Sequence, residues 1–418
     1  MNLAWVAYRL AAPCLGAILP AARVFVPSRE RAHWDERLGR TSLPEGADAW
    51  IHAASMGEAT AVGPFVRELQ ALAPRSRFLL TATTRGGCER LGALGQTAAV
   101  APLDSPQAAA RFFTGVTPRR CFLLETELWP HWLLQARASR VPVAVVSARL
   151  SGTSVARYQR LGAEFRGLVS GLAAVLCQSE LDLERWRSLG ARAEVSTVTG
   201  NLKDDGLPAA APERGAARVA LGLDRERPLL VLGSVRPGEV LVLARAWRRL
   251  PAVLRESWQV VAVPRHPQAS AELRAEAARA GQALAGAIGG EDGAWFWDDR
   301  LGVLREYYGV ADVAFVGGSL TPYGGHNPLE PAACGAALIM GPHHASQRDV
   351  VRALEAAGAL RVAKSETEDV AGVLERLLGD AEACVAAGRA ARRVVEQRRG
   401  AARRTVARLV ELGLWGVT

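Results

Sequence analysis

Short apolar runs alternate with amphipathic stretches from Trp50 onward. The runs have the length of buried strands, and the stretches between them have the spacing of helices. The predicted strands are Trp50–Ala54, Phe78–Thr83, Ala98–Pro102, Cys121–Leu124, Val141–Ser147, Ala173–Cys177 and Val195–Thr199. Predicted helices between them include Ala59–Leu72, Ser105–Phe113 and Glu180–Leu189. This alternation indicates a parallel sheet covered by helices, and such sheets bind ligands at the carboxyl ends of their strands.

A second series of the same kind follows the stretch Asp204–Arg214, which has the glycine, prolines and small residues of a linker. Its predicted strands are Leu229–Gly233, Val260–Pro264, Val313–Gly317 and Ala337–Gly341. A chain of 418 residues is long enough for two domains with full cores. We therefore expect an α/β protein of two Rossmann-like domains with a cleft between them.

The two ends of the chain have other patterns. Residues 3–26 are mostly apolar, interrupted by Arg9, Arg23 and two prolines. A tilted membrane span, a helix lying in the membrane interface and a buried first helix of the domain all fit, and we favour membrane association. The last segment, Asp380–Val410, is helical in pattern and rich in arginine. Such a helix face is usually solvated, although it would also suit anionic lipid.

The composition is globular, and the net charge of +9 favours an anionic partner such as a nucleotide or a membrane surface. Nucleic acid is disfavoured, because the chain has no recognised nucleic-acid module and no basic run interleaved with aromatics. The six cysteines are scattered without a CxxC pair. That spacing argues for reduced thiols and against a disulfide framework or a zinc site.

Carboxylates follow two of the predicted strands of the first domain. Glu58 stands at a helix start, where it caps the helix or, facing a cleft, could take a proton from a substrate hydroxyl. Glu125 and Glu127 follow the strand that ends at Leu124. In extended backbone their spacing places both on one face, which would push one of them toward a raised pKa. Lys203 stands beside the expected linker, where a lysine is usually solvated.

The stretch Phe315–Pro331 is a predicted strand, two glycine pairs and the start of a helix. Asn327 can cap that helix, Pro328 suits its first position, and Glu330 completes a capping box. Backbone N–H groups at such a terminus could bind a nucleotide phosphate, or the stretch could be an ordinary capped joint. The chain has no HExxH, Walker A, GxSxG or opening GxGxxG motif. This counts against metalloproteases, P-loop ATPases, α/β-hydrolases and dehydrogenases.

Taken together, these loops resemble one family. The motifs that carry the resemblance are Ser55-Met56-Gly57-Glu58, Glu125-Thr126-Glu127-Leu128-Trp129-Pro130, Ala148-Arg149-Leu150-Ser151, Gly200-Asn201-Leu202-Lys203, Pro264-Arg265-His266-Pro267 and the stretch Phe315–Pro331. They resemble the 3-deoxy-D-manno-octulosonic acid (Kdo) transferases, appear in that family's order and span nearly the whole chain.

The resemblance implies a GT-B glycosyltransferase that moves Kdo from CMP-Kdo to a lipid A precursor in lipopolysaccharide biosynthesis, at the cytoplasmic face of the inner membrane. It implies an anchor helix over residues 1–28, an acceptor domain over 29–205 and a donor domain over 206–398. Residues 399–418 would form a C-terminal helix that packs back on the first domain. The implied partners are the CMP-sugar, the lipid acceptor and anionic lipids of the inner membrane, with no nucleic acid.

By match to the family, Glu58 would be the general base, and Glu125 and Lys203 would assist at the transition state. The residues implied to bind the CMP part of the donor are Pro264, Arg265, Leu301, Gly302, Val303, Gly318, Ser319, Asn327, Pro328, Leu329 and Glu330. Sugar transfer needs a base, stabilisation of an oxocarbenium-like state and a clamp on the departing phosphate. A helix terminus with an arginine nearby could form that clamp, so we expect no cofactor and no metal.

Some positions depart from the family's pattern. Leu301-Gly302-Val303 stands where a carboxylate is usual, and Arg236 replaces a usual histidine. Ser346 and Gln347 replace an asparagine, and Asp204 replaces an aromatic. These departures leave the reaction class intact, but they leave open a relative that uses another activated sugar. A non-catalytic lipid- or nucleotide-binding scaffold that kept the fold is a separate alternative. The number of Kdo residues transferred, the acyl pattern of the acceptor and the oligomeric state also stay open.

Overall fold

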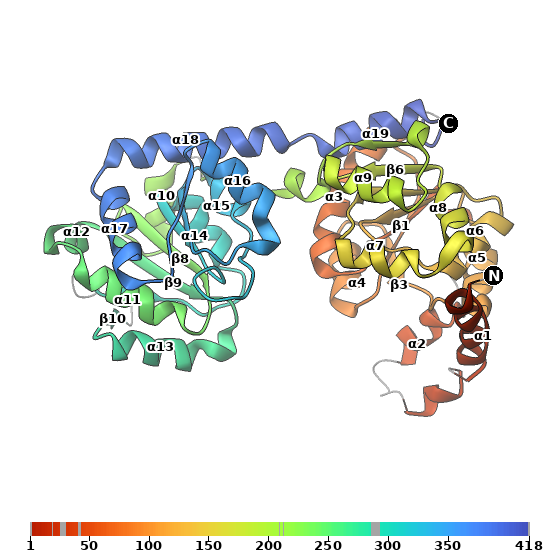
Figure 1. Ribbon diagram of the computed structural model, residues 1–418, viewed down its shortest axis with the longest axis horizontal. Helices are drawn as coiled ribbons and strands as arrows, with labels where there is room; N and C mark the ends of the chain where they lie inside the picture. Colours follow the sequence, from red (N-terminus) through yellow and green to blue (C-terminus); the bar gives the residue numbers. More distant parts are fainter. Residues whose placement is uncertain are drawn as a thin grey trace. The chain divides into compact units, whose positions relative to one another are not determined.

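A computed structural model describes residues 2–18, 20–25, 31–40, 43–208, 210–211, 213–285 and 293–416 (Figure 1). Parts of the expected anchor (residues 1, 19 and 26–28) and of the expected linker (residues 209 and 212) lie outside them. The chain divides into two compact units, one of residues 1–206 and 400–418 and the other of residues 207–399. The expected roles of these units, acceptor and donor, stay predictions.

The first unit is built on a parallel seven-stranded sheet in the order β3-β2-β1-β4-β5-β6-β7. Its strands are β1 (Ala49–His52), β2 (Phe78–Ala82), β3 (Thr97–Val100), β4 (Cys121–Leu124), β5 (Val143–Ala148), β6 (Ala174–Cys177) and β7 (Ser196–Val198). Its helices are α1 (Leu3–Ile18), α2 (Arg31–Arg37), α3 (Met56–Leu72), α4 (Arg85–Gly92), α5 (Pro106–Val116), α6 (Pro130–Ala138), α7 (Gly152–Gln159), α8 (Gly162–Ser170), α9 (Glu180–Ser188) and α19 (Ala401–Glu411). Short 3-10 turns are η1 (Ala21–Phe25), η3 (Ala193–Val195) and η4 (Leu202–Gly206).

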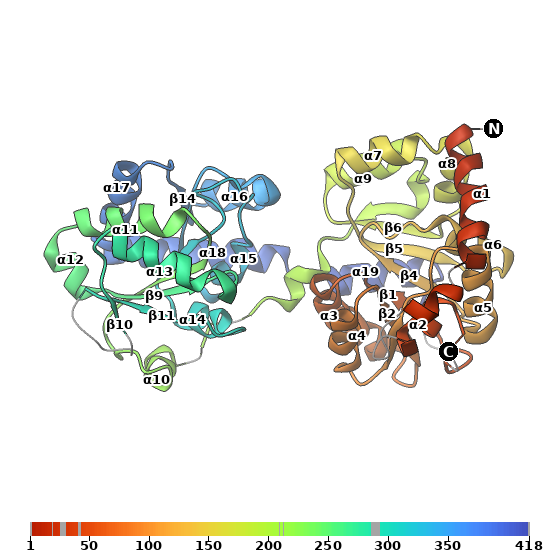
Figure 2. The same ribbon diagram turned by 90° about the horizontal axis from the view of Figure 1, so that it is seen from below.

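Alternate residues of these strands enter two cores, one on each face of the sheet. Trp50 and Leu79 lie in the core with α5, α6, α8 and α9. Ile51 and Leu80 lie in the core with α3, α4 and α19. Figure 2 shows α3 and α4 apart from α5 and α6 across the sheet. Burial on both faces explains why these strands read as continuous apolar runs.

The second unit repeats the plan with a parallel seven-stranded sheet in the order β10-β11-β9-β8-β12-β13-β14. Its strands are β8 (Leu229–Val235), β9 (Gln259–Pro264), β10 (Leu284–Ala285), β11 (Trp295–Trp297), β12 (Val313–Val316), β13 (Ala337–Met340) and β14 (Leu360–Val362). Its helices are α10 (Arg214–Ala220), α11 (Glu239–Arg249), α12 (Ala252–Ser257), α13 (Ser270–Arg279), α14 (Leu304–Val310), α15 (Leu329–Cys334), α16 (Arg348–Ala356), α17 (Thr367–Leu378) and α18 (Ala381–Arg398), with 3-10 turns η5 (Pro267–Ala269) and η6 (Ala345–Gln347).

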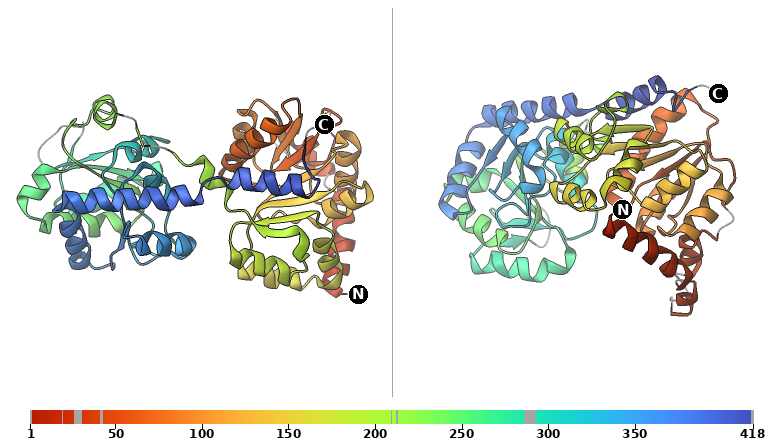
Figure 3. Two further views of the ribbon diagram at one scale, coloured as in Figure 1. Left: turned by 90° about the horizontal axis from the view of Figure 1, so that it is seen from above. Right: turned by 45° about the vertical axis from the view of Figure 1, so that its right-hand side comes forward.

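The C-terminal arginine-rich stretch is two helices rather than one. Gly400 has a φ of +82° and separates α18 from α19. Figure 3 shows α18 running along the second unit and α19 along the first. Asp205 holds the start of α19 by accepting from the N–H groups of Gly400 and Ala402. Arg408 donates to the carbonyl of Glu194, so this arginine of the stretch is bonded within the first unit.

At the end of the chain, Trp415 is buried in the first unit. Its ring stacks on Phe78 at 5.6 Å between centroids, and its Nε1 donates to the carbonyl of Leu69 at 3.0 Å. The guanidinium of Arg120 lies 4.9 Å from the ring centroid. The last described residues therefore complete the core on the α3 face of the first sheet.

Helix α1 packs against α5 and α8 through one face, with Trp5 and Ala12 buried and the Tyr8 hydroxyl donating to Asp104. Leu3, Leu10 and Ile18 lie exposed on the rest of the helix. No helix in the described ranges is long and apolar enough to cross a membrane. A span is therefore not found there, and the interfacial helix that we also weighed remains a prediction.

Candidate active site

The strand orders mark two places where ligands are expected. In the first sheet, the order in which strands are added reverses between β1 and β4, and in the second sheet it reverses between β8 and β12. Open parallel sheets bind ligands at the carboxyl ends of the strands at such a switch point. Glu58 follows β1 and Glu125 follows β4, so topology brings these two sequence-predicted residues to one edge. Glu125 has a φ of +56°, a left-handed conformation that is costly outside glycine and is often found at functional sites.

Glu58 lies in the first turn of α3 and forms a capping box. Ser55 accepts from the Glu58 N–H, and the carboxylate accepts from the Ser55 hydroxyl at 3.0 Å and from the Ala54 N–H at 2.9 Å. Burial, then the charge of Glu125, raises the pKa of Glu58 to about 7 in spite of these bonds. The residue therefore caps its helix and also has the pKa that a base at neutral pH needs.

Glu125 and Lys203 meet directly, with 2.5 Å between Lys203 Nζ and Glu125 Oε1. Lys203 lies in η4, which follows β7 by a tight turn at Gly200. Asn201 caps this turn by accepting from the Lys203 N–H at 3.0 Å. The lysine that looked solvated in the sequence is thus held against a carboxylate at the carboxyl edge of the first sheet.

Glu127 makes different contacts from Glu125, because the left-handed turn at Glu125 breaks the extended backbone that we assumed. Its Oε2 accepts from Trp129 Nε1 at 2.7 Å and lies 3.6 Å from His52 Nε2. Burial alone would raise the pKa of Glu127, but His52 and Trp129 outweigh it and lower the pKa. The prediction that one of this pair has a raised pKa is therefore wrong for Glu127, and the raised pKa falls on Glu58 instead.

His52 is a residue of this site that the sequence analysis missed. It is fully buried in β1, and its Nδ1 lies 2.9 Å from Thr81 Oγ1, which also accepts from Trp50 Nε1. The signal in the sequence was a histidine inside an apolar strand. Such a residue is ordinarily a packed core group, and only the fold brings its ring to Glu127.

In the second unit, the glycine-flanked loop after β12 is organised by a buried carboxylate. Glu239 is fully buried, and its oxygens accept from the N–H groups of Gly318, Ser319 and Leu320, each at 2.8 Å. A fourth bond comes from the Arg236 N–H at 2.8 Å. Burial raises the pKa of Glu239, and the four backbone donors oppose that rise.

This carboxylate corrects part of the predicted phosphate site. The N–H groups of Gly318 and Ser319 are already bonded to Glu239 and are not free for a phosphate. The Ser319 hydroxyl is also committed, since it donates to the Val316 carbonyl and accepts from the Gly341 N–H. The chain thus uses its own carboxylate to bind the N–H groups of Gly318 and Ser319, two residues that the family resemblance assigned to the CMP part of the donor.

The helix start that follows matches the predicted cap with a shift of one residue. Helix α15 begins at Leu329, and Pro328 stands at its N-cap position. Asn327 Oδ1 accepts from the Leu329 N–H at 3.0 Å, and its Nδ2 lies 3.5 Å from Glu330 Oε1. Burial raises the pKa of Glu330, opposed by the bond from Asn327 and by the charges of Arg265 and Arg305.

The other predicted nucleotide residues follow β9 and β11, which are neighbours in the sheet. Pro264 ends β9 and pairs with Val235, and Arg265 is exposed just beyond it. Of the turn before α14, Leu301 is 84% exposed, whereas Val303 is 9% exposed and packs into the core of the unit. The roles of these residues in nucleotide binding stay predictions.

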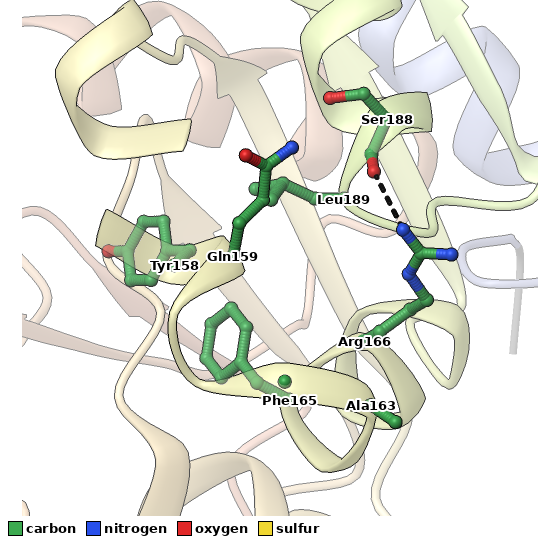
Figure 4. A pocket seen from close by; sticks show the side chains of 8 residues that line it. Tyr158, Gln159, Ala163, Phe165, Arg166, Ser188 and Leu189 are labelled. Atoms are coloured by element: carbon green, nitrogen blue, oxygen red, sulfur yellow. Dashed lines mark hydrogen bonds between the residues drawn. The ribbon is translucent and has the colours of Figure 1, made fainter. Parts of the chain in front are cut away.

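A cavity of about 400 Å³ lies elsewhere in the first unit, between α7, α8 and α9 (Figure 4). Its lining includes Tyr158, Phe165, Arg166 and Leu189, and none of the predicted site residues. The Tyr158 and Phe165 rings stack at 4.9 Å, and the Tyr158 hydroxyl donates to the carbonyl of Thr126. Among the described residues, no group of three or more His, Cys, Asp or Glu side chains could hold a metal ion.

Two parallel Rossmann-like units, each with a polar cluster at its switch point, define the GT-B fold. The fold is similar to that of UDP-GlcNAc 2-epimerase from Neisseria meningitidis, with a TM-score of 0.61, 14% identity, and coverage of 87% of this chain and 99% of that one. It is also similar to Anabaena HepE in complex with UDP and glucose, with a TM-score of 0.59, 13% identity, and coverage of 88% and 100%.

Sequence comparisons narrow the class. Residues 32–206 match the family model described as 3-deoxy-D-manno-octulosonic-acid transferase (kdotransferase). The chain is 38% identical to the 3-deoxy-D-manno-octulosonic acid transferase of Bordetella pertussis, over 92% of this chain and 90% of that one. It is 32% identical to the enzyme of the same name from Haemophilus influenzae, over 88% and 87%. The chain belongs to the Kdo transferase family, as its sequence motifs predicted.

Proposed function

We propose that this chain transfers Kdo from CMP-Kdo to a lipid A precursor, with Glu58 as the general base. The observation that carries the proposal is the meeting of Glu58, with a pKa of about 7, and the Glu125–Lys203 pair at the switch point of the first sheet. A base with that pKa is half ionised at neutral pH. Much of the carboxylate is then free to accept a proton, and its affinity for the proton is still high. The relatives named as Kdo transferases support the choice of sugar.

In this proposal the acceptor hydroxyl donates its proton to the Glu58 carboxylate as its oxygen attacks the anomeric carbon of Kdo. The Ala54 N–H and the Ser55 hydroxyl already hold the Glu58 carboxylate in place. Little free energy is therefore needed to orient the carboxylate at the moment of reaction. The bond between the sugar and the phosphate breaks as the new glycosidic bond forms. CMP leaves with the bonding pair.

Glu125 would stabilise the oxocarbenium-like charge, because its carboxylate lies at the same edge of the sheet. Lys203 holds that carboxylate in place through the 2.5 Å contact. On the second unit, Arg265 and the Asn327–Glu330 turn would hold the nucleotide, with Glu330 accepting from ribose hydroxyls. We propose no cofactor beyond the donor.

We further propose that α1 lies in the cytoplasmic surface of the inner membrane and places the lipid acceptor near the site. Leu3, Leu10 and Ile18 are 86%, 67% and 65% exposed on α1, and Phe25 in η1 is 89% exposed. Exposed apolar side chains on a helix suit insertion into the headgroup boundary, and the net charge of +9 suits anionic lipid.

The test is to incubate the purified protein with CMP-Kdo and tetraacylated lipid A precursor and to weigh the lipid by mass spectrometry. A lipid heavier by one or more Kdo units supports the proposal and counts the sugars added. A product with a different CMP-sugar but none with CMP-Kdo favours the relative with another donor. No product with any activated sugar, together with retained CMP binding, favours the scaffold.

A further inference from the structure

Two arginines emerge next to each other at the carboxyl edge of the second sheet. Arg236 directly follows β8 and Arg265 directly follows β9. The last paired residues of these strands are Val235 and Pro264, and the Arg265 N–H donates to the Val235 carbonyl at 3.1 Å. The two guanidinium groups therefore start from adjacent strand ends, beside the switch point between β8 and β12.

His326 joins them from the glycine-flanked loop. Its N–H donates to the Gly317 carbonyl at 3.1 Å, and its ring atoms lie 3.0 Å from where a Cβ on Gly318 would stand. Burial, followed by the charges of Arg265, Arg236 and His266, lowers the pKa of His326 to about 4. Positive charge thus converges on this loop from the ends of β8 and β9.

The guanidinium of Arg236 is held without a carboxylate. It lies 4.1 Å from the centroid of the Tyr323 ring, in a cation–π contact. Its Nε is buried and has no hydrogen-bond partner among the described residues. The nearest acidic residue in the sequence, Glu239, is committed to four backbone N–H groups. A buried donor without an acceptor is costly, and an anionic oxygen from outside the chain would satisfy it.

We propose that Arg236 is a specificity-determining residue of the donor site, where its guanidinium, braced by Tyr323 and paired with Arg265, binds anionic oxygens of the CMP-sugar. This inference rests on the proposed function for the identity of the donor. The donor has two such groups, the phosphate of CMP and the carboxylate of the sugar, and a planar guanidinium suits both.

The experiment measures binding to the full-length chain and its Arg236→Gln and Tyr323→Leu variants. The probes are cytidine, CMP and CMP-Kdo, with binding followed by calorimetry or NMR titration. Arg274→Gln is the matched control, since Arg274 also lies over an aromatic ring, that of Trp297 at 6.0 Å. Thermal unfolding of each variant checks that the second unit stays folded.

Loss of roughly tenfold in CMP affinity, with cytidine unchanged, supports the phosphate as the group bound. An unchanged CMP affinity with a roughly tenfold weaker CMP-Kdo affinity supports the sugar carboxylate. Affinities for CMP and CMP-Kdo within twofold of wild type in Arg236→Gln would overturn the inference, as would an equal loss for cytidine. Binding needs no turnover, so an Arg236-dependent CMP affinity would stand even if no Kdo transfer were found.

Discussion

Replacing Glu58 by Gln separates its role in the helix cap from its role in proton transfer. Glutamine can accept from the Ala54 N–H through its amide oxygen and donate from its amide nitrogen to the Ser55 hydroxyl oxygen, so it can still form a capping box. The variant should therefore fold with the unfolding temperature of the wild type. It cannot accept a proton, so we expect Kdo transfer to fall by roughly 10²- to 10⁴-fold.

The pH dependence sharpens this prediction. With a pKa raised to about 7, Glu58 is protonated and inactive as a base at low pH and becomes ionised as the pH rises through 7. The kcat/KM of the wild type should therefore fall about tenfold for each pH unit below 7. The residual rate of the Glu58→Gln variant should not show this fall at acid pH.

The assay is transfer of Kdo to lipid acceptor at pH 5 to 9, read by mass spectrometry, with CMP binding measured in parallel. Glu89→Gln is the control, because Glu89 is an exposed carboxylate in a surface ion pair with Arg85. CMP affinity should be unchanged in both variants. Turnover within threefold of wild type in Glu58→Gln, or an acid limb that persists in it, would refute the base assignment.

Four further changes test other parts of the structure. Lys203→Met leaves Glu125 unpaired near Glu58, so Kdo transfer should fall by roughly 100-fold. The pH below which the residual rate declines should rise by about one unit, because the unpaired charge of Glu125 raises the pKa of Glu58 further. A shift of that decline to lower pH would contradict the pairing argument. Glu239→Gln places an amide N–H group against some of the four backbone donors and should lower the free energy of unfolding by about 2–4 kcal/mol, measured by urea denaturation. Glu226→Gln, at an exposed position, is the control. Equal stability of the two variants would mean that the loop rearranges freely. Leu10→Glu with Ile18→Glu should reduce co-sedimentation with anionic vesicles by roughly tenfold at an unchanged unfolding temperature, and unchanged partitioning would place the membrane contact elsewhere. Trp415→Ala should destabilise the first unit by about 3–5 kcal/mol in thermal unfolding, and a loss below 1 kcal/mol would show that its stacking on Phe78 is dispensable.

Most of the fold could be predicted from the sequence because its strands are buried on both faces. Continuous apolar runs located β4 at its true bounds, Cys121–Leu124, and most other strands within two residues. The strands β10, β11 and β14 were missed. They have two or three residues each, and β10 and β14 are edge strands, so they leave no clear periodic pattern.

Contacts that join distant segments were less predictable. Motifs pointed to Glu125 and Lys203, yet their 2.5 Å contact depends on a left-handed residue and on the order of strands. Glu239 lay in a stretch that we noted, but nothing local says that its carboxylate fills the N–H nest of a loop 79 to 81 residues away. The family resemblance assigned Gly318 and Ser319 to CMP binding, and their N–H groups instead bind the chain's own carboxylate.

The break between α18 and α19 has a consequence for how the protein is made. The core around α3 needs Ala402, Val406 and Trp415, which are synthesised after the whole second unit. A ribosome-bound chain can therefore complete the second unit, residues 207–399, while Phe78 and Phe122 of the first still lack their partner ring. The first unit can therefore complete its core only after the second unit has been synthesised, whereas an N-terminal domain usually finishes folding first. A chain truncated before Gly400 would carry the carboxylates of the active site on a unit whose core cannot close.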